Sequence, residues 1–156
     1  MKDLRILIGL IILCESVGIL GAVFTTPSIP TWYATLAKPV FSAPNWLFFP
    51  VWTTLYLLMG VSAYLIWTSG MKKIAINSAL MIFALQLTLN LLWSIAFFAF
   101  HSLLGGFIVI VFLWFAIAIN IVSFGRLSRN AALILSPYLL WVTFAAILNF
   151  AVLMLN

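Results

Sequence analysis

The chain has 156 residues, of which 67% are hydrophobic and only 6% are charged, and its mean hydropathy is +1.31. A soluble domain carries about 25% charged residues, so this composition excludes a water-soluble protein. The formal net charge is +5, but the basic residues are scattered between apolar segments rather than gathered on one face, so we expect no nucleic-acid partner.

Five apolar segments are long enough to cross a bilayer, since one crossing takes about 20 residues. The sequence therefore predicts an all-α integral membrane protein, in which a bundle of five transmembrane helices forms a single domain over residues 1–156. The expected helices cover residues 4–24, 46–67, 74–100, 103–124 and 131–155.

Residues 25–45 are expected to form a long first loop. Most of the prolines fall in or next to this segment, namely Pro27, Pro30, Pro39, Pro44 and Pro50. Proline lacks an amide donor and disfavours helix in the residue before it. Within the loop we expect a short helix over residues 31–38, capped by Thr31 and stopped by Pro39. The sequence thus predicts a partly helical loop that forms a lid.

The basic residues predict the orientation in the membrane. Those on one side of the expected bundle are Lys2, Arg5, Lys72, Lys73, Arg126 and Arg129, whereas Lys38 stands alone on the other side. By the positive-inside rule, the amino terminus is expected in the cytoplasm and the carboxyl terminus outside. We expect the membrane to be the cytoplasmic membrane of a prokaryote.

Three of the expected helices carry large aromatic residues and a hydrogen-bonding group on one face. These faces are Trp52, Tyr56, Met59, Gly60, Ala63 and Trp67 on the second; Gln86, Asn90, Trp93 and Phe97 on the third; and Tyr138, Trp141, Ala145 and either Leu148 or Asn149 on the fifth. Such stripes are often plain helix packing. Their recurrence on three helices predicts instead the wall of a pocket for a flat, mostly apolar ligand.

Two polar residues inside the other helices are open to more than one interpretation. Glu15 shares a stripe with Gly18 and Ala22 at helical spacing, and no basic residue lies at its depth. We expect its carboxyl group to be protonated or hydrogen-bonded to a hydroxyl or amide, either as a packing contact or as a proton or ligand site. Asn120 on the fourth helix is expected to pack against a neighbouring helix or another subunit.

The sequence lacks the motifs of conventional hydrolysis, phosphoryl transfer or metal binding. Its one cysteine, Cys14, and its one histidine, His101, lie far apart along the chain. We expect no metal site and no required cofactor.

Several ordered motifs resemble the TspO/MBR family of tryptophan-rich sensory proteins and translocator proteins. Residues 32–39 read WYATLAKP, like the W-Y-x-x-L-x-K-P signature of that family. Further segments that look like the family are PNW at 44–46, PVWTTLY at 50–56, LNLLWS at 89–94 and PYLLW at 137–141.

The resemblance implies a five-helix bundle, commonly a homodimer, with a pocket beneath the first loop for porphyrins, haem and related planar ligands. Carried over residue by residue, the pocket includes Tyr33, Trp52, Asn90, Trp93, Trp141, Ala145 and Asn149. The stripe on the second helix adds Tyr56 to this set. Lys38 is a further candidate, since its amino group could pair with a ligand propionate or instead extend toward solvent. The chain lacks the carboxyl-terminal tyrosine and basic residue of the sterol motif, which makes a sterol partner a weaker expectation.

Three functions remain open from the sequence. The first is a receptor or binding protein for protoporphyrin IX, haem and similar ligands, with a sensing or transport role. The second is an enzyme that degrades porphyrin with light and oxygen, as the resemblance implies for some bacterial relatives, through Trp52 and Trp141. The third is a scaffold whose tryptophan faces only pack.

Overall fold

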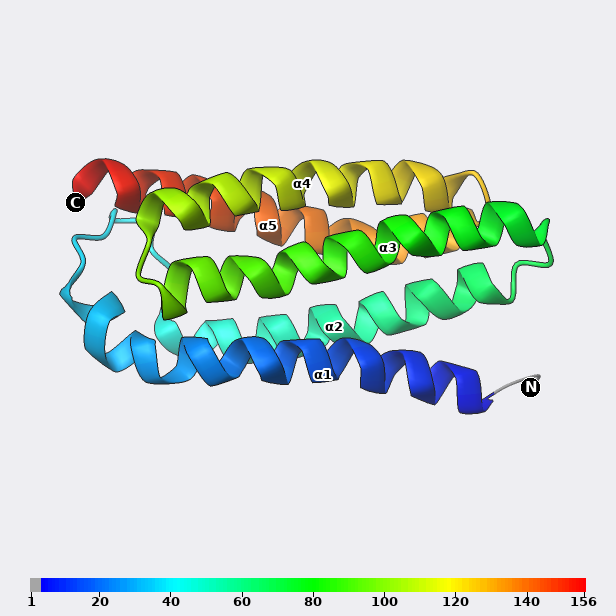
Figure 1. Cartoon of the computed structure of the whole chain (residues 1–156), viewed down its shortest axis with the longest axis horizontal. Helices are drawn as coiled ribbons and strands as arrows, with labels where there is room; N and C mark the ends of the chain where they lie inside the picture. Colours follow the sequence, from blue (N-terminus) through cyan, green and yellow to red (C-terminus); the bar gives the residue numbers. More distant parts are fainter. Residues whose placement is uncertain (1–3) are drawn as a thin grey trace.

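The computed structural model describes residues 4–156 as a bundle of long helices that run alongside one another (Figure 1). The long helices are α1 (Leu4–Ser28), α2 (Asn45–Trp67), α3 (Lys73–Ser94), α4 (Leu103–Gly125) and α5 (Arg129–Leu155). Short π-helical segments, η1 (Ile29–Tyr33) and η2 (Ile95–Ala99), continue α1 and α3. Within the described residues, five helices are long and apolar enough to span a membrane, which confirms the expected fold class.

The first helix is longer than the sequence suggested, so the expected start of the loop at residue 25 is wrong. Helix α1 contains Pro27 and passes into η1, where Pro30 lies. Hydroxyl groups bond to carbonyls of this segment: Ser28 Oγ donates to Phe24 O at 3.0 Å, and Thr31 Oγ1 donates to Pro27 O at 2.8 Å. Such hydroxyls and π-type turns let membrane helices tolerate proline. The expected short helix is therefore the end of the first spanning segment.

The loop that remains is fastened to the bundle near its start. Residues 36–44 are non-helical. Ala37 N donates to Asn156 Oδ1 at 2.9 Å, and Asn156 Nδ2 donates back to Ala37 O at 3.0 Å, so the loop is joined to the end of α5. Just before the loop, the ring of Trp32 in η1 stacks on His101 with centroids 4.4 Å apart. The loop is therefore held against the bundle.

The two ends of the bundle differ in charge. The described start of the chain and the α2–α3 and α4–α5 connections lie at one end, and residues 36–44 and the carboxyl terminus lie at the other (Figure 1). We call them the basic end, which carries Arg5, Lys72, Lys73, Arg126 and Arg129, and the loop end, which carries Lys38. Lys2 lies outside the described residues. The direction in which the bundle crosses the membrane stays a prediction.

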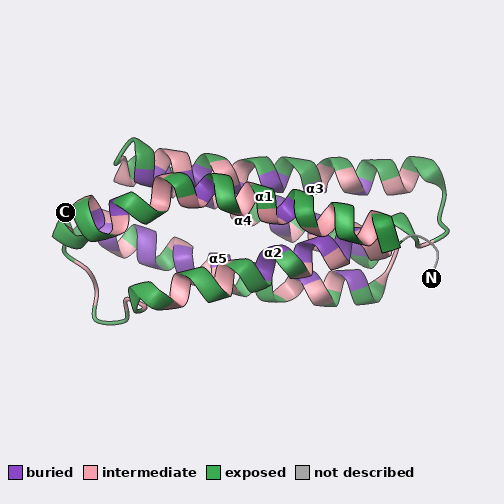
Figure 2. Ribbon diagram, turned by 90° about the horizontal axis from the view of Figure 1, so that it is seen from below, coloured by how far each residue is buried: buried purple, intermediate pink, exposed green. Residues whose placement is uncertain are grey.

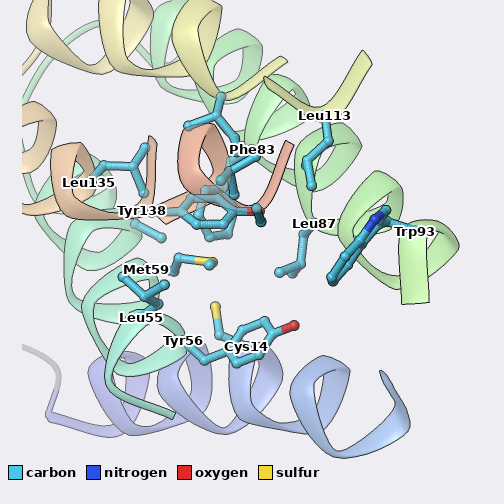
Figure 3. Close-up of a cluster of buried hydrophobic side chains, with 14 of the residues drawn as sticks. Cys14, Leu55, Tyr56, Met59, Phe83, Leu87, Trp93, Leu113, Leu135 and Tyr138 are labelled. Atoms are coloured by element: carbon cyan, nitrogen blue, oxygen red, sulfur yellow. The ribbon is translucent and has the colours of Figure 1, made fainter. Parts of the chain in front are cut away.

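The core is closely packed between the middle of the bundle and its basic end. Met59 and Tyr138 are fully buried in the cluster shown in Figure 3. Ser62 Oγ donates to Ala131 O at 2.8 Å between α2 and α5. Asn120 is also buried, and its Nδ2 donates to Ala79 O at 3.4 Å, so α4 packs on α3 as expected. Every long helix has exposed residues along its outer face (Figure 2), and many of them are large and apolar, as lipid contact requires.

Candidate functional site

A cavity of about 370 Å³ lies between α1, α2 and the end of α3 with η2. Its wall on the first spanning segment extends from Glu15 to Ile29, its wall on α2 from Asn45 to Tyr56, and its wall on α3 and η2 from Asn90 to Phe98. At about 1.5 Å per residue, the first wall is about 21 Å long. The cavity is therefore a narrow cleft that runs from the loop end to the middle of the bundle.

The cleft has a mouth between α1 and α2. Its exposed lining residues all belong to the first spanning segment or α2, namely Ile19, Thr26, Asn45, Phe49 and Thr53. Its lining residues from α3 and η2 are all buried, namely Asn90, Trp93, Ser94 and Phe98. The cleft is thus closed by α3 at the back and opens toward the lipid-facing side of the bundle.

Aromatic rings form much of the inner wall. The Trp52 ring centroid lies 5.7 Å from that of Tyr56 and 6.0 Å from that of Trp93, with tilted planes. The Trp93 ring meets Phe98 edge-on at 5.9 Å. Rings at these distances and angles support one another and offer flat apolar surfaces to a ligand.

The inner end of the cleft is joined to the core by a chain of hydrogen bonds. Tyr56 Oη donates to Asn90 Oδ1 at 2.5 Å, and Asn90 Nδ2 donates to Tyr138 Oη at 2.8 Å. Gly18 makes room for this arrangement, because a Cβ atom there would lie 2.5 Å from the Tyr56 ring. The chain connects α2, α3 and α5 and fixes the polar groups at the bottom of the cleft.

A second, much smaller cavity of about 30 Å³ lies toward α5. Phe48, Trp93 and Phe98 line both cavities and so stand between them. Asn149 lines the smaller one, where its Oδ1 accepts a hydrogen bond from Trp93 Nε1 at 3.1 Å. A volume of this size holds about one water molecule and no organic ligand.

Comparison with known proteins assigns the chain to a family. The model of the TspO/MBR family matches residues 10–155, almost the whole chain. The chain belongs to the TspO/MBR family.

The relatives of this TspO/MBR protein come from distant organisms. The "Tryptophan-rich protein TspO" of Chlorobaculum tepidum is 45% identical over 144 residues, which are 92% of this chain and 91% of that protein. The protein of the same name from Archaeoglobus fulgidus is 43% identical over 96% of each chain. The "Translocator protein" of Bos taurus is 34% identical over 92% of this chain and 85% of that protein. These relatives support a membrane sensory or binding role.

The structure brings part of the expected site together in this TspO/MBR protein. Trp52, Tyr56, Asn90 and Trp93 line the large cleft. Tyr33, Ala145 and Asn149 line the smaller cavity instead, on the far side of Phe48 and Trp93.

Two expected residues lie outside both linings. Trp141 packs edge-on against Phe48 at 5.9 Å, and its buried Nε1 has no hydrogen-bond partner among the described residues. Phe48 and Trp93 keep α5 away from the cleft, which is why the fifth-helix residues do not reach it. Lys38 Nζ lies 4.7 Å above the Tyr33 ring and donates to Leu36 O at 3.3 Å.

The sequence interpretation missed most of the α1 wall. The stripe of Glu15, Gly18 and Ala22 continues at helical spacing to Thr25 and Ile29, and all of these residues line the cleft. The signal was present in the sequence, but the prolines suggested that the helix ended before Thr25. Glu15 itself has no hydrogen-bond or ion-pair partner among the described residues, so of the two expected states the hydroxyl or amide contact is not found, and a protonated carboxyl group stays a prediction.

Proposed function

We propose that the cleft binds a porphyrin-type ligand, protoporphyrin IX or haem, or a related planar hydrophobic molecule, and that the protein acts through this binding in sensing or transport. The observation that carries the proposal is an apolar cleft of about 370 Å³ walled by the rings of Trp52, Tyr56 and Trp93. Small-molecule sites are typically concave, largely apolar and about 300–1,000 Å³ in volume, with a few polar groups that fix orientation.

The shape of the cleft suits a flat ligand. Its wall on the first spanning segment is about 21 Å long, and its mouth lies between α1 and α2 beside Ile19 and Phe49. A porphyrin with its side chains has a larger volume than the cleft. One part of the ring would therefore lie against Trp52 while the rest extends through the mouth toward lipid. The relatives named "Tryptophan-rich sensory protein" and "Translocator protein" support a role in sensing or transport.

The experiment is a titration of the purified protein with protoporphyrin IX in nanodiscs, followed by the absorbance of the porphyrin. We expect saturable binding in the micromolar range. Trp52→Ala should weaken it about tenfold, because stacking of a flat ring on an aromatic side chain contributes about 1–3 kcal/mol. The matched control is Trp46→Ala, since Trp46 is 73% exposed at the start of the same helix and lines neither cavity. Absence of saturable binding to the native protein contradicts the proposal.

The same sample distinguishes binding from degradation. Trp52 is in ring contact with Trp93 and Tyr56, all side chains that can lose an electron to a photoexcited neighbour. If the protein consumes porphyrin with light and oxygen, porphyrin fluorescence will fall under illumination in the native protein and persist in Trp52→Phe. The companion variant Trp141→Phe tests whether that residue contributes from outside the cleft. If the porphyrin fluorescence of the native protein stays constant under illumination, degradation is excluded and binding alone is supported.

A further inference from the structure

We propose that Glu15 makes the inner end of the cleft selective for flat apolar ligands that present an N–H or ammonium donor there. The inference deepens the proposed function and rests on the cleft being a ligand site. It specifies which functional group of the ligand lies at the inner end of the cleft, and it makes Glu15 a specificity-determining residue.

Glu15 lies at the inner end of the cleft. It is the first residue of the α1 wall, about one helical turn before Gly18, on which the Tyr56 ring rests. Tyr56 and Asn90 form the facing walls at the same end. The inner end is therefore built from one carboxyl group, one phenol and one amide.

At this end, the carboxyl group of Glu15 is the side-chain polar group that has no hydrogen-bond partner among the described residues. Asn90 Oδ1 already accepts from Tyr56 Oη at 2.5 Å, and Asn90 Nδ2 donates to Tyr138 Oη at 2.8 Å. Glu15 has no such partner within residues 4–156, and it is the only acidic residue in that range. A carboxyl oxygen accepts hydrogen bonds whether or not the group is ionised. The strongest unused acceptor in the cleft is thus Glu15.

A hydrogen-bond donor from a ligand would stabilise the carboxyl group of Glu15 at this position. A polar group within the apolar span of a membrane helix is costly to leave unpaired. A ligand N–H group at this point offsets that cost with a hydrogen bond. An ammonium group does so with a charge-assisted hydrogen bond, which is about twice as strong as a neutral one. A ligand carboxylate at the same point would find no positive group, because none of the residues that line the cleft is basic. Lys38 lies beyond the lining, in the loop between η1 and α2.

The two ends of the cleft therefore sort the polar groups of a ligand. Donor groups are favoured at Glu15, and carboxylates are favoured toward Lys38. A porphyrin would enter with its propionates at the loop end and its apolar edge inward. Planar aromatic amines would fit the inner end better than aromatic acids or alcohols of the same shape.

The test uses two probes of almost equal shape, 2-naphthylmethylamine, which is an ammonium ion at neutral pH, and 2-naphthylmethanol. Binding is measured in nanodiscs of zwitterionic lipid and corrected for uptake by empty nanodiscs. The native protein should bind the amine at least about tenfold more tightly than the alcohol. Glu15→Gln and Glu15→Leu should reduce this ratio to about one, mainly by weakening the binding of the amine.

The matched control is Ser16→Ala. Ser16 is exposed, adjoins Glu15 on α1, lies outside the cleft and donates only to Ile12 O of its own helix at 2.6 Å. It should keep the preference for the amine. Equal amine-to-alcohol ratios in the native protein and both Glu15 variants overturn the inference alone, provided that protoporphyrin IX still binds. Failure of protoporphyrin and both naphthyl probes to bind overturns the proposed function as well.

Discussion

The pair formed by α1 and α2 is closed near the basic end and hollow toward the loop end. Near the basic end, Gly60 lies against the backbone of Ile11, where an added Cβ atom would come within 2.7 Å of Ile11 Cα. Toward the loop end, α2 carries Trp52 and Phe48 where it faces the same helix, and the cleft separates the two. Small residues allow membrane helices to touch, and large rings hold them apart.

This difference shows how a bundle without a hydrophobic driving force between helices can keep a cleft open. The close contact at Gly60 brings α1 and α2 together, and toward the loop end the cleft and the aromatic side chains of α2 lie between the two helices. The hydrogen-bond chain from Tyr56 through Asn90 to Tyr138 lies where the two regions meet. The packed region toward the basic end and this hydrogen-bond chain thus hold the walls of the cleft in place.

The largest effect is expected from closing the space at Gly60. Gly60→Val places a branched side chain against the Ile11 backbone, which cannot move aside as a flexible side chain could. Overpacking of this kind typically costs about 1–3 kcal/mol, and we expect the upper part of that range in a denaturant titration of the protein in mixed micelles. Protoporphyrin binding should weaken as well, because the larger side chain pushes α1 away from α2, and both helices form walls of the cleft.

The control is Gly9→Ala on α1, since an added Cβ atom at Gly9 meets nothing within 4 Å. Alanine is a better helix former than glycine by up to about 1 kcal/mol, so this variant should be neutral or slightly more stable. A Gly60→Val protein as stable as Gly9→Ala would mean that the closed contact does not set the spacing of the two helices.

A smaller effect, on binding alone, is expected from filling the cleft. Ala22 lines the cleft from α1, and Ala22→Phe adds a ring to the space that a ligand would occupy. We expect protoporphyrin affinity to fall about 30-fold, equivalent to about 2 kcal/mol, with unchanged or higher thermal stability. Val23→Phe is the control, because Val23 is exposed on the outer face of the same helix. Full binding by Ala22→Phe would place the ligand outside the cleft.

The closed and hollow regions were not equally predictable from the sequence. The number of spanning helices follows from hydropathy, because a membrane span needs a long apolar segment whatever its neighbours are. The aromatic wall of Trp52, Tyr56 and Trp93 follows from helical spacing. The contact of Gly60 with Ile11 does not, because it depends on the crossing of two helices that the sequence does not specify.

The errors have equally local causes. The prolines near the end of α1 suggested a loop, but Ser28 and Thr31 hydroxyls and a π-type turn sustain the helix there. The aromatic and amide residues of α5 have the spacing of a pocket wall, yet Trp141 packs on Phe48 outside the cleft. Periodicity identifies which face of a helix turns inward, but which inward-facing side chains reach a cavity depends on the rings that stand between them.

The smallest effect is expected at the loop end, where Lys38 would meet a ligand carboxylate. Lys38 is half-buried above the Tyr33 ring, so its amino group is held near the loop end. Lys38→Gln should weaken binding of protoporphyrin IX about threefold, in keeping with the roughly 0.2–1 kcal/mol of partly exposed ion pairs. The dimethyl ester of the same porphyrin has no carboxylate, so its affinity should not change. Lys73→Gln at the basic end is the control and should alter neither ligand. An equal loss for the acid and the ester would mean that Lys38 acts by packing on Tyr33 rather than by charge, and the cleft would then sort ligands at its inner end alone.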